Sequence, residues 1–256
     1  YVRLYCTSGY GNQATIRQVL AEEKPDALLH VTDPRYWGWL YRMENEIRKN
    51  IPLCYYHVWD NEPAPLYNKT IYESCDWIGC ISKVTHKCVE GVSSTNNYSY
   101  VPHGVDVDIY RPLDKEASIK CRQNLLEDSC EFMLLVNNAN MRRKQMLLTL
   151  EAFDKFCSKL KLSESQSVAL LLHTNPTNNV GSNLNIAIDN LYPNRNIIFS
   201  TSVVSDETLN QMYNSADVTL NLASNEGFGL ATLESLSAGT PIIVNKSGGL
   251  SEQIDD

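Results

Sequence analysis

Two glutamates and two glycines in one short stretch have the types and spacing that suit a phosphate-binding loop. Glu226 is followed by Gly227 and Gly229, and seven residues separate Glu226 from Glu234. Glycines let the backbone approach a ligand closely, and a helix that begins there offers unpaired N–H groups and the positive end of its dipole. The stretch therefore predicts a phosphate site. The alternative is that Glu226 only complements the helix dipole and Glu234 lies on a solvated face.

A basic cluster elsewhere in the chain could supply charge to the same ligand. Arg142, Arg143 and Lys144 follow an apolar strand predicted over 131–136 and stand at the entrance of a helix expected to run through Lys159. Positive side chains at a helix N-terminus are locally unfavourable, so a bound anion would explain them. Arginine offers a planar fork to phosphate oxygens and lysine a compact charge. The alternative is three solvated charges.

The elements around the two glutamates predict a parallel α/β unit. Residues 218–222 are apolar and β-branched, 224–229 form a loop, 230–238 have helical spacing, and 241–244 are apolar again. A strand, loop, helix and strand in this order form a right-handed crossover, and the working loop lies at the carboxyl end of the first strand. Strands and helices alternate through most of the chain, which indicates an α/β fold with parallel sheets.

The same reasoning predicts the remaining elements. Helices are expected over 12–23, 36–49, 66–74, 83–90, 115–126, 184–191 and 206–216. Strands are expected over 27–31, 53–58, 77–82, 98–101, 167–173 and 197–199. Asp206 is the expected N-cap of the last helix in the first list.

The stretch E-GFGLATL-E, followed by SLSAGTPIIV and a Gly-Gly loop, resembles the signature of the family-four retaining glycosyltransferases of the GT-B fold. The resemblance implies two Rossmann-like domains and a nucleoside diphosphate sugar as donor. It implies that Glu226 is catalytic and faces the transferred sugar, while Glu234 holds the ribose of the nucleotide. Donor phosphates would be bound by the loop and the helix start: Gly227, Phe228, Gly229 and Leu230.

The resemblance also extends to the basic cluster. Arg143 and Lys144 match the basic pair that follows the first strand of the family's C-terminal domain. The surrounding loop departs from the commoner form, because Gln145 replaces a usual glycine and asparagines occupy the positions before the pair. Arg142 therefore stays a rival for the arginine. Val204 resembles the position whose main chain meets the nucleobase, and a plain core valine is the equal alternative.

The segment PHGVDVDIYRP, residues 102–112, interrupts the alternation of strands and helices. It resembles the family's crossover between its two Rossmann-like domains, and an ordinary loop is the alternative. We expect an acceptor-side domain over 1–108 and a nucleotide-sugar-binding domain over 109–256. Compared with family members, both domains are expected to be incomplete: the first lacks its initial strands and the second its final helices.

Candidates on the acceptor side lie near the ends of predicted strands. His57 stands near Asp60 at the end of a strand, where many family members place a histidine that faces the donor sugar, so His57 is a second catalytic candidate. A histidine packed and hydrogen-bonded within the sheet is the alternative. Further candidates on this side are Asp60 itself, Asp33 in TDP and His103 in PHGVD.

The composition of the chain narrows the classes of protein to which it can belong. The chain has 256 residues, of which 43% are hydrophobic, and its formal net charge of −8 argues against a broad nucleic-acid-binding surface. Its eight cysteines include no C-x-x-C pair, which favours buried reduced thiols in a cytoplasmic protein over a zinc site. No apolar run approaches the ~20 residues that span a bilayer.

Together these features predict a retaining, metal-independent glycosyltransferase that moves a sugar from a nucleoside diphosphate sugar to an acceptor hydroxyl. No metal or other cofactor is expected, because the family typically neutralises the leaving diphosphate with basic side chains and a helix N-terminus. The acceptor stays open between glycan, lipid and protein, as does peripheral membrane contact through parts outside this chain. Two alternatives remain: a non-catalytic sugar-nucleotide-binding or scaffold protein, and a GT-B-like sugar-nucleotide epimerase.

Overall fold

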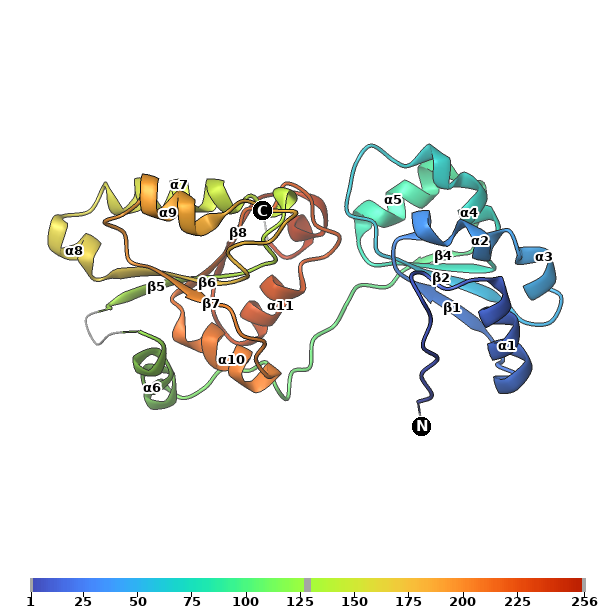
Figure 1. Ribbon diagram of the computed structural model, residues 1–256, viewed down its shortest axis with the longest axis horizontal. Coiled ribbons are helices and arrows are strands. Elements are labelled where there is room, and N and C mark those ends of the chain that lie inside the picture. Colours follow the sequence, from blue (N-terminus) through green and yellow to red (C-terminus); the bar gives the residue numbers. More distant parts are fainter. Residues whose placement is uncertain (1, 127–129, 255–256) are drawn as a thin grey trace. The chain divides into compact units, whose positions relative to one another are not determined.

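The computed structural model describes residues 2–126 and 130–254 (Figure 1). The chain divides into two compact units, Tyr1–His103 (unit 1) and Gly104–Asp256 (unit 2). This division comes slightly earlier than the one expected between 108 and 109. Val105, Ile109 and Tyr110 pack against the core of unit 2, and this packing assigns the segment after His103 to that unit.

Unit 1 is built on a four-stranded parallel sheet in the order β1-β2-β3-β4. Its strands are β1 (Leu28–Val31), β2 (Leu53–His57), β3 (Trp77–Cys80) and β4 (Tyr98–Tyr100). Its helices are α1 (Gln13–Glu23), η1 (Pro34–Trp37), α2 (Gly38–Tyr41), α3 (Glu44–Ile47), η2 (Leu66–Asn68), α4 (Lys69–Glu73) and α5 (Lys83–Val92). Alternate residues of β2 are buried, namely Leu53, Tyr55 and His57, because one face of the sheet packs on the core of unit 1.

The helix predicted over 36–49 is wrong as a single element. The chain forms η1, α2 and α3 there, and the breaks fall at Trp37 and Met43, where ψ is 16° and 4°. Gly38, a poor helix former, follows the first break. The interruption lets Leu40 and Met43, among others, reach the core of unit 1. Tertiary packing has therefore overridden a helical pattern that is weak in this stretch.

Unit 2 is built on a five-stranded parallel sheet in the order β7-β6-β5-β8-β9. Its strands are β5 (Phe132–Asn137), β6 (Val168–His173), β7 (Ile197–Ser200), β8 (Val218–Asn221) and β9 (Ile242–Val244). The order runs outward in one direction from β5 to β7 and in the other from β8 to β9. The sheet thus reverses between β5 and β8, which is the topological switch point of a doubly wound fold.

Helices cover both faces of this second sheet. They are α6 (Lys115–Leu125), η3 (Arg142–Lys144), α7 (Met146–Cys157), α8 (Leu162–Gln166), α9 (Leu184–Leu191), α10 (Asp206–Ser215), α11 (Leu230–Ser237) and η4 (Gly248–Glu252). In Figure 1, α7 and α9 lie on one face and α10 and α11 on the other. Each face has its own apolar core, one with Phe153 of α7 and the other with Met212 of α10. Strands covered on both faces explain why β5 and β6 read as continuous apolar runs.

One local prediction needs correction. Ser205, not Asp206, is the N-cap of α10, because the Ser205 side chain accepts a hydrogen bond from the N–H of Thr208. Asp206 is the first helical residue and accepts a hydrogen bond from the hydroxyl of Tyr110 at 3.2 Å. The short helix α8 was not predicted. Within the described residues, no helix is both long and apolar enough to cross a membrane.

Candidate active site

Two loops meet at the carboxyl ends of β5 and β8. The loop after β5 leads through η3 into α7, and the loop after β8 leads through Glu226 into α11. The loops touch each other, since the N–H of Ser224 donates to the carbonyl of Arg143 at 2.8 Å. Parallel sheets of this kind bind ligands outside the carboxyl ends of their strands, where the strand order reverses. This edge of unit 2 is therefore the candidate site.

The predicted basic pair and the first predicted carboxylate are in direct contact there. Arg143 Nη1 donates to Glu226 Oε2 at 2.6 Å, and Lys144 Nζ donates to Glu226 Oε1 at 2.6 Å. Arg143 Nη1 also donates to the carbonyl of Asn225 at 2.9 Å. Each oxygen of the carboxylate is thus held by a different cation. Arg142 is exposed, so Arg143 is the arginine that the fold brings to Glu226.

This ion cluster is largely withdrawn from water. The side chains of Lys144 and Glu226 are only 9% and 11% exposed, whereas that of Arg143 is 35% exposed. Charges in such a position interact strongly, and removing one partner leaves the other uncompensated. The cluster is therefore a preorganised group of charges with one side, at Arg143, still open to solvent.

Backbone geometry places Lys144 and α7. Gln145, which follows Lys144, has φ 54° and lies in the left-handed region that favours glycine. The family resemblance leads one to expect a glycine here, which would adopt this conformation without strain, and Gln145 adopts it instead. That turn separates η3 from α7 and directs the Lys144 side chain toward Glu226.

A pair of glycines lies directly against the Glu226 loop. A Cβ atom on Gly248 would overlap the carbonyl oxygen of Glu226, and one on Gly249 would meet the backbone of Gly227 and Phe228. The N–H of Gly249 donates to the carbonyl of Glu226 at 2.8 Å. Close backbone packing of this kind is available only to glycine. The Gly-Gly segment therefore fixes the position of the loop that carries Glu226.

The start of α11 follows the same loop. Gly229 has φ 96° and serves as the N-cap, and as a glycine it has no side chain to cap this helix end. Gly227 is half-buried, Phe228 is buried and Leu230 is 43% exposed. The Gln253 side chain donates to the carbonyls of Phe228 and Gly229 at 2.8 and 3.0 Å, which holds the turn in place.

Glu234 lies further along α11 and takes part in a separate hydrogen-bond chain. The hydroxyl of Tyr213, on α10, donates to Glu234 Oε2 at 2.7 Å, and the side chain of Asn137, at the end of β5, donates to that hydroxyl at 2.8 Å. Burial raises the pKa of Glu234 above its ordinary value, the hydrogen bond from Tyr213 opposes this, and the charge of Asp206 adds to it. Glu234 therefore sits at the same edge of the sheet as Asn137, with one oxygen engaged by a phenol.

Val204 lies in the loop between β7 and α10. Its side chain is partly buried and packs against the core that contains Met212. This packing is what the core-valine alternative requires. The backbone of Val204 lies in a loop that continues into Ser205 and α10. A main-chain contact between Val204 and a nucleobase stays a prediction.

The candidate site residues of unit 1 do not form one cluster of contacts, unlike Arg143, Lys144 and Glu226 in unit 2. His57 has no exposed surface, its Nε2 lies 2.7 Å from the Tyr72 hydroxyl and its Nδ1 3.1 Å from that of Tyr55. Burial lowers the pKa of His57 to about 3 despite the nearby charge of Asp33. This environment contradicts the expectation that the His57 ring faces a ligand. It matches the alternative, a histidine packed and hydrogen-bonded in the sheet.

The other three candidates of unit 1 lie in loops. Asp33 caps η1 and pairs with Arg35, and Asp60 is half-buried just beyond β2. His103 Nδ1 lies 3.0 Å from the hydroxyl of Tyr56, and burial lowers the pKa of His103. All three follow the carboxyl ends of strands, which is where parallel sheets bind ligands. Their role on the acceptor side stays a prediction.

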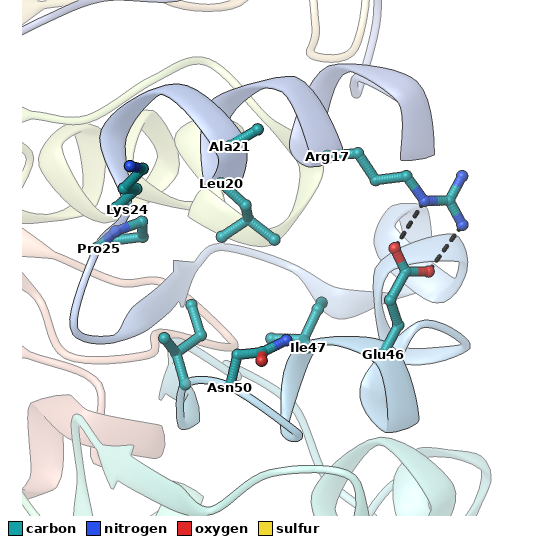
Figure 2. Close-up of a pocket in the computed structure, with 9 residues that line it drawn as sticks. Arg17, Leu20, Ala21, Lys24, Pro25, Glu46, Ile47 and Asn50 are labelled. Atoms are coloured by element: carbon teal, nitrogen blue, oxygen red, sulfur yellow. Dashed lines mark hydrogen bonds and ion pairs between the residues drawn. The ribbon is translucent and has the colours of Figure 1, made fainter.

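Unit 1 also contains a pocket of about 540 Å³ between α1 and α3 (Figure 2). Figure 2 shows Arg17 and Glu46 facing each other across its rim, joined by two hydrogen bonds of 2.7 Å. Pro25 and Ile51, which line it, precede β1 and β2, so the pocket lies at the amino ends of these strands. Ligands of parallel sheets bind at the opposite edge, and none of the predicted site residues lines this pocket.

Several residues of the candidate site had not been singled out from the sequence. They are Asn225, Tyr213, Asn137 and Gln253. Their contacts join segments far apart in the chain, and single polar residues in such segments carry no local signal. The Gly-Gly loop was noted as part of the motif, but its packing role could be seen only in three dimensions. Within 2–126 and 130–254, no group of three or more His, Cys, Asp or Glu side chains is placed to hold a metal ion.

Comparison with known proteins identifies the family. The profile described as glycosyl transferases group 1 matches residues 119–256, more than half of the chain. The chain belongs to this family. A curated relative, the MMP alpha-(1->4)-mannosyltransferase of Mycolicibacterium hassiacum, is 27% identical over 154 residues, which are 60% of this chain and 32% of that protein. An uncharacterized glycosyltransferase of Methanocaldococcus jannaschii is 45% identical over 51 residues, 20% of this chain and 13% of that protein.

Solved structures confirm the fold of this group 1 family member as GT-B, with two Rossmann-like units. HepE of Anabaena, in complex with UDP and glucose, has a TM-score of 0.74 at 15% identity and matches 94% of this chain and 65% of its own. Sucrose-phosphate synthase of Thermosynechococcus elongatus has a TM-score of 0.73 at 17% identity, over 94% of this chain and 61% of its own. The chain thus spans less than two thirds of these structures and about a third or less of the two curated relatives.

Proposed function

We propose that this chain carries out retaining, metal-independent transfer of a sugar from a nucleoside diphosphate sugar to an acceptor hydroxyl, with the donor bound by unit 2. One observation carries the proposal: Arg143, Lys144 and Glu226 are in direct contact at the switch point of a doubly wound sheet. Cations, a carboxylate and an uncapped helix start at one edge provide groups for an anionic leaving group and for a sugar.

Each part of the donor has a proposed partner. The diphosphate binds Arg143, Lys144 and the backbone at the start of α11, whose dipole also favours negative charge. The ribose hydroxyls bind the Glu234 carboxylate, and the transferred sugar binds Glu226. HepE was solved with UDP-glucose, and the Mycolicibacterium relative is described as a mannosyltransferase, which supports a sugar nucleotide as the donor class.

The ion cluster gives the reaction an electrostatic basis. As the bond between the sugar C1 and the diphosphate oxygen breaks, negative charge grows on the diphosphate and positive charge on the sugar ring. Arg143 and Lys144 stabilise the former and Glu226 the latter. The acceptor oxygen then bonds to C1 on the same face of the sugar, and its proton passes to the departing diphosphate. Fixed basic groups can neutralise the leaving group without a divalent metal.

Two further parts of the proposal concern the rest of the protein. The acceptor binds unit 1, whose loops after β1, β2 and β4 carry the remaining candidates, Asp33, Asp60 and His103. A cytoplasmic location is supported by the eight cysteines, all of which are free thiols in the structure.

A donor-turnover assay tests this function. The chain is incubated with UDP-, GDP- and ADP-sugars and an acceptor panel, with and without EDTA, and product anomers are assigned by NMR. The expected result is nucleoside diphosphate release and a product of retained configuration that EDTA does not suppress. Inversion, or EDTA inhibition reversed by magnesium, would contradict the retaining or the metal-independent part. Turnover of donor to an epimer without acceptor would favour an epimerase, and binding without turnover a scaffold.

A further inference from the structure

Unit 1 exposes several aromatic side chains near the carboxyl ends of β1 and β2. Tyr10, Tyr36 and Tyr67 are 53%, 54% and 64% exposed, so more than half of each residue is open to solvent. Tyr36 lies in η1, which follows β1, and Tyr67 lies in η2, which follows β2. We call these three tyrosines, together with Arg35 and Trp59, the aromatic surface.

The rings of the aromatic surface are joined by contacts. Tyr10 and Tyr36 stack with centroids 4.5 Å apart and an interplanar angle of 7°. Arg35 Cζ lies 5.3 Å from the centroid of the Trp59 ring, and that ring meets Tyr67 at 6.1 Å and 66°. Arg35 and Tyr36 are neighbours in η1, and this short helix links the two ring pairs.

Polar groups lie among these rings. Arg35 Nε donates to both oxygens of Asp33, at 3.0 and 2.9 Å, and both side chains keep exposed area. The hydrogen bond to Asp33 raises the pKa of Arg35, burial opposes this, and the charge of Asp33 adds to it. A carboxylate, a guanidinium and phenol hydroxyls thus offer acceptors and donors beside apolar ring faces.

Burial and hydrogen bonds fix parts of the aromatic surface. Trp59 is only 8% exposed, and its Nε1 donates to the carbonyl of Asn61 at 2.7 Å. Asp33 accepts from the N–H of Arg35 and so caps η1. Thr32, which joins β1 to Asp33, has φ 151°, a sparsely populated conformation for a β-branched residue. Groups that are already held in place lose little entropy on binding, which suits a ligand site.

We propose that the aromatic surface is the acceptor subsite and that the acceptor is a carbohydrate. A pyranose ring has an apolar C–H face, which an exposed aromatic ring covers, and a rim of hydroxyls, which charged side chains can bind. A lipid tail would have to pack against an ion pair as well as rings. An anionic membrane would contact the Arg35 guanidinium, which is already paired with Asp33. The role of this surface as an acceptor subsite rests on the proposed transfer function. Binding of a saccharide to it does not depend on that function.

Saccharide binding to the whole chain, without nucleotide, tests this assignment. An array of gluco-, manno- and galacto-oligosaccharides is screened, and hits are titrated by tryptophan fluorescence and saturation-transfer NMR. Tyr36→Ala and Tyr67→Ala are expected to weaken binding about threefold to tenfold, the value of one aromatic contact. Tyr36→Phe, which keeps the ring, should retain most of the affinity. Tyr100→Ala is the matched control, since Tyr100 is 43% exposed on the far edge strand β4.

Three results would overturn the assignment: no saccharide binds, the alanine variants bind as tightly as the parent, or phosphatidylglycerol vesicles or peptides bind through the same tyrosines instead. A parallel titration with UDP and GDP separates this outcome from failure of the proposed function. Loss of saccharide binding with intact nucleoside diphosphate binding would remove only the acceptor assignment. Tyrosine-dependent saccharide binding with no nucleotide binding would instead leave the subsite standing and contradict the donor site.

Discussion

Glu226 is the residue on which the candidate site depends most, because its carboxylate is shared by Arg143 and Lys144 in a nearly buried position. In the free protein this carboxylate occupies the cations that we assign to the donor diphosphate. Binding of a diphosphate must therefore compete with Glu226 for them, and the competition frees the carboxylate for the sugar. Glu226 is thus proposed as both a ground-state partner of the basic pair and a group that acts on the sugar ring.

Glu226→Gln is expected to have opposite effects on stability and binding. The ligand-free protein should lose about 2–4 kcal/mol of unfolding free energy, because two cations lose a charged partner. Nucleoside diphosphate should bind more tightly than to the parent, while sugar transfer is lost. Calorimetry and urea unfolding measure both quantities. Glu151→Gln, which alters an exposed helical pair with Lys155, is the control. Weaker diphosphate binding in the variant would contradict the competition.

Glu234→Gln is expected to separate folding from nucleotide recognition. Its folded pKa is raised, so the stability it contributes is present below pH 4.5 and is lost as pH rises through the folded pKa. At neutral pH the substitution should leave the free protein as stable as the parent or more so. Nucleotide affinity should fall by about 1–3 kcal/mol, because a carboxylate no longer accepts from the ribose.

A ligand without the 2′- and 3′-hydroxyls of the ribose makes this test specific to Glu234. In the parent protein, a 2′,3′-dideoxy nucleoside diphosphate should bind more weakly than the natural ligand. In the Glu234→Gln variant the two ligands should bind almost equally, because the partner of the hydroxyls is gone. An undiminished difference between the ligands in the variant would show that the ribose lies elsewhere.

The sequence motif singled out the residues that meet at the candidate site but did not predict their contacts. Arg143, Lys144 and Glu226 were identified by motif, yet their pairing joins positions more than eighty residues apart and follows only from the order β5-β8. His57 shows the opposite case. It lies at a strand end as predicted, but the alternation of β2 points it into the core, and only burial data reveal this.

Elements position the site through close backbone packing. The Gly248 segment lies against the Glu226 loop, and the left-handed turns at Gln145 and Gly229 set the starts of α7 and α11. The sequence predicted both helix starts and the strands before them because apolar periodicity is strong there. It could not predict the broken helix over 36–49, whose course depends on the core it covers.

Gly248→Ala is expected to displace the Glu226 loop. A methyl group would overlap the Glu226 carbonyl, and φ 52° is itself unfavourable for alanine, so a loss of about 2–4 kcal/mol in unfolding free energy is expected. Diphosphate affinity should fall with it. Gly91→Ala is the control: it lies in α5 with open space at its Cβ position and should be neutral or stabilising by about 1 kcal/mol. An undisturbed Gly248→Ala protein would contradict the packing role.

For the whole molecule, the two units should differ in their response to acid. Burial lowers the pKa of His30 to about 4 and that of His57 to about 3, and both lie in unit 1. Because these folded values lie below the unfolded value of 6.5, the stability they contribute is present above pH 6.5 and is lost as pH falls. Each histidine should cost unit 1 about 1.4 kcal/mol per pH unit below 6.5.

This acid response can be measured separately in each unit. All four tryptophans, at positions 37, 39, 59 and 77, lie in unit 1, so their fluorescence during urea unfolding reports that unit. Between pH 6.5 and 4.5, above the range where most carboxylates titrate, the fluorescence midpoint should fall. Hydrogen exchange of β5 and β6 amides follows unit 2 in the same series. A fluorescence midpoint that is constant over this range would contradict the buried neutral histidines.

Calorimetric titration of UDP, GDP and ADP into the parent, Lys144→Ala and Lys155→Ala proteins tests the donor site most directly. Lys155 is the control because it is an exposed lysine on α7 and its ion pair with Glu151 lies on the helix surface. The account predicts that one nucleoside diphosphate binds the parent, that its nucleoside binds much more weakly, and that Lys144→Ala removes most of this difference while Lys155→Ala leaves it intact. Equal binding of nucleoside and nucleoside diphosphate, or a difference that survives Lys144→Ala, would contradict the assignment of the phosphate site.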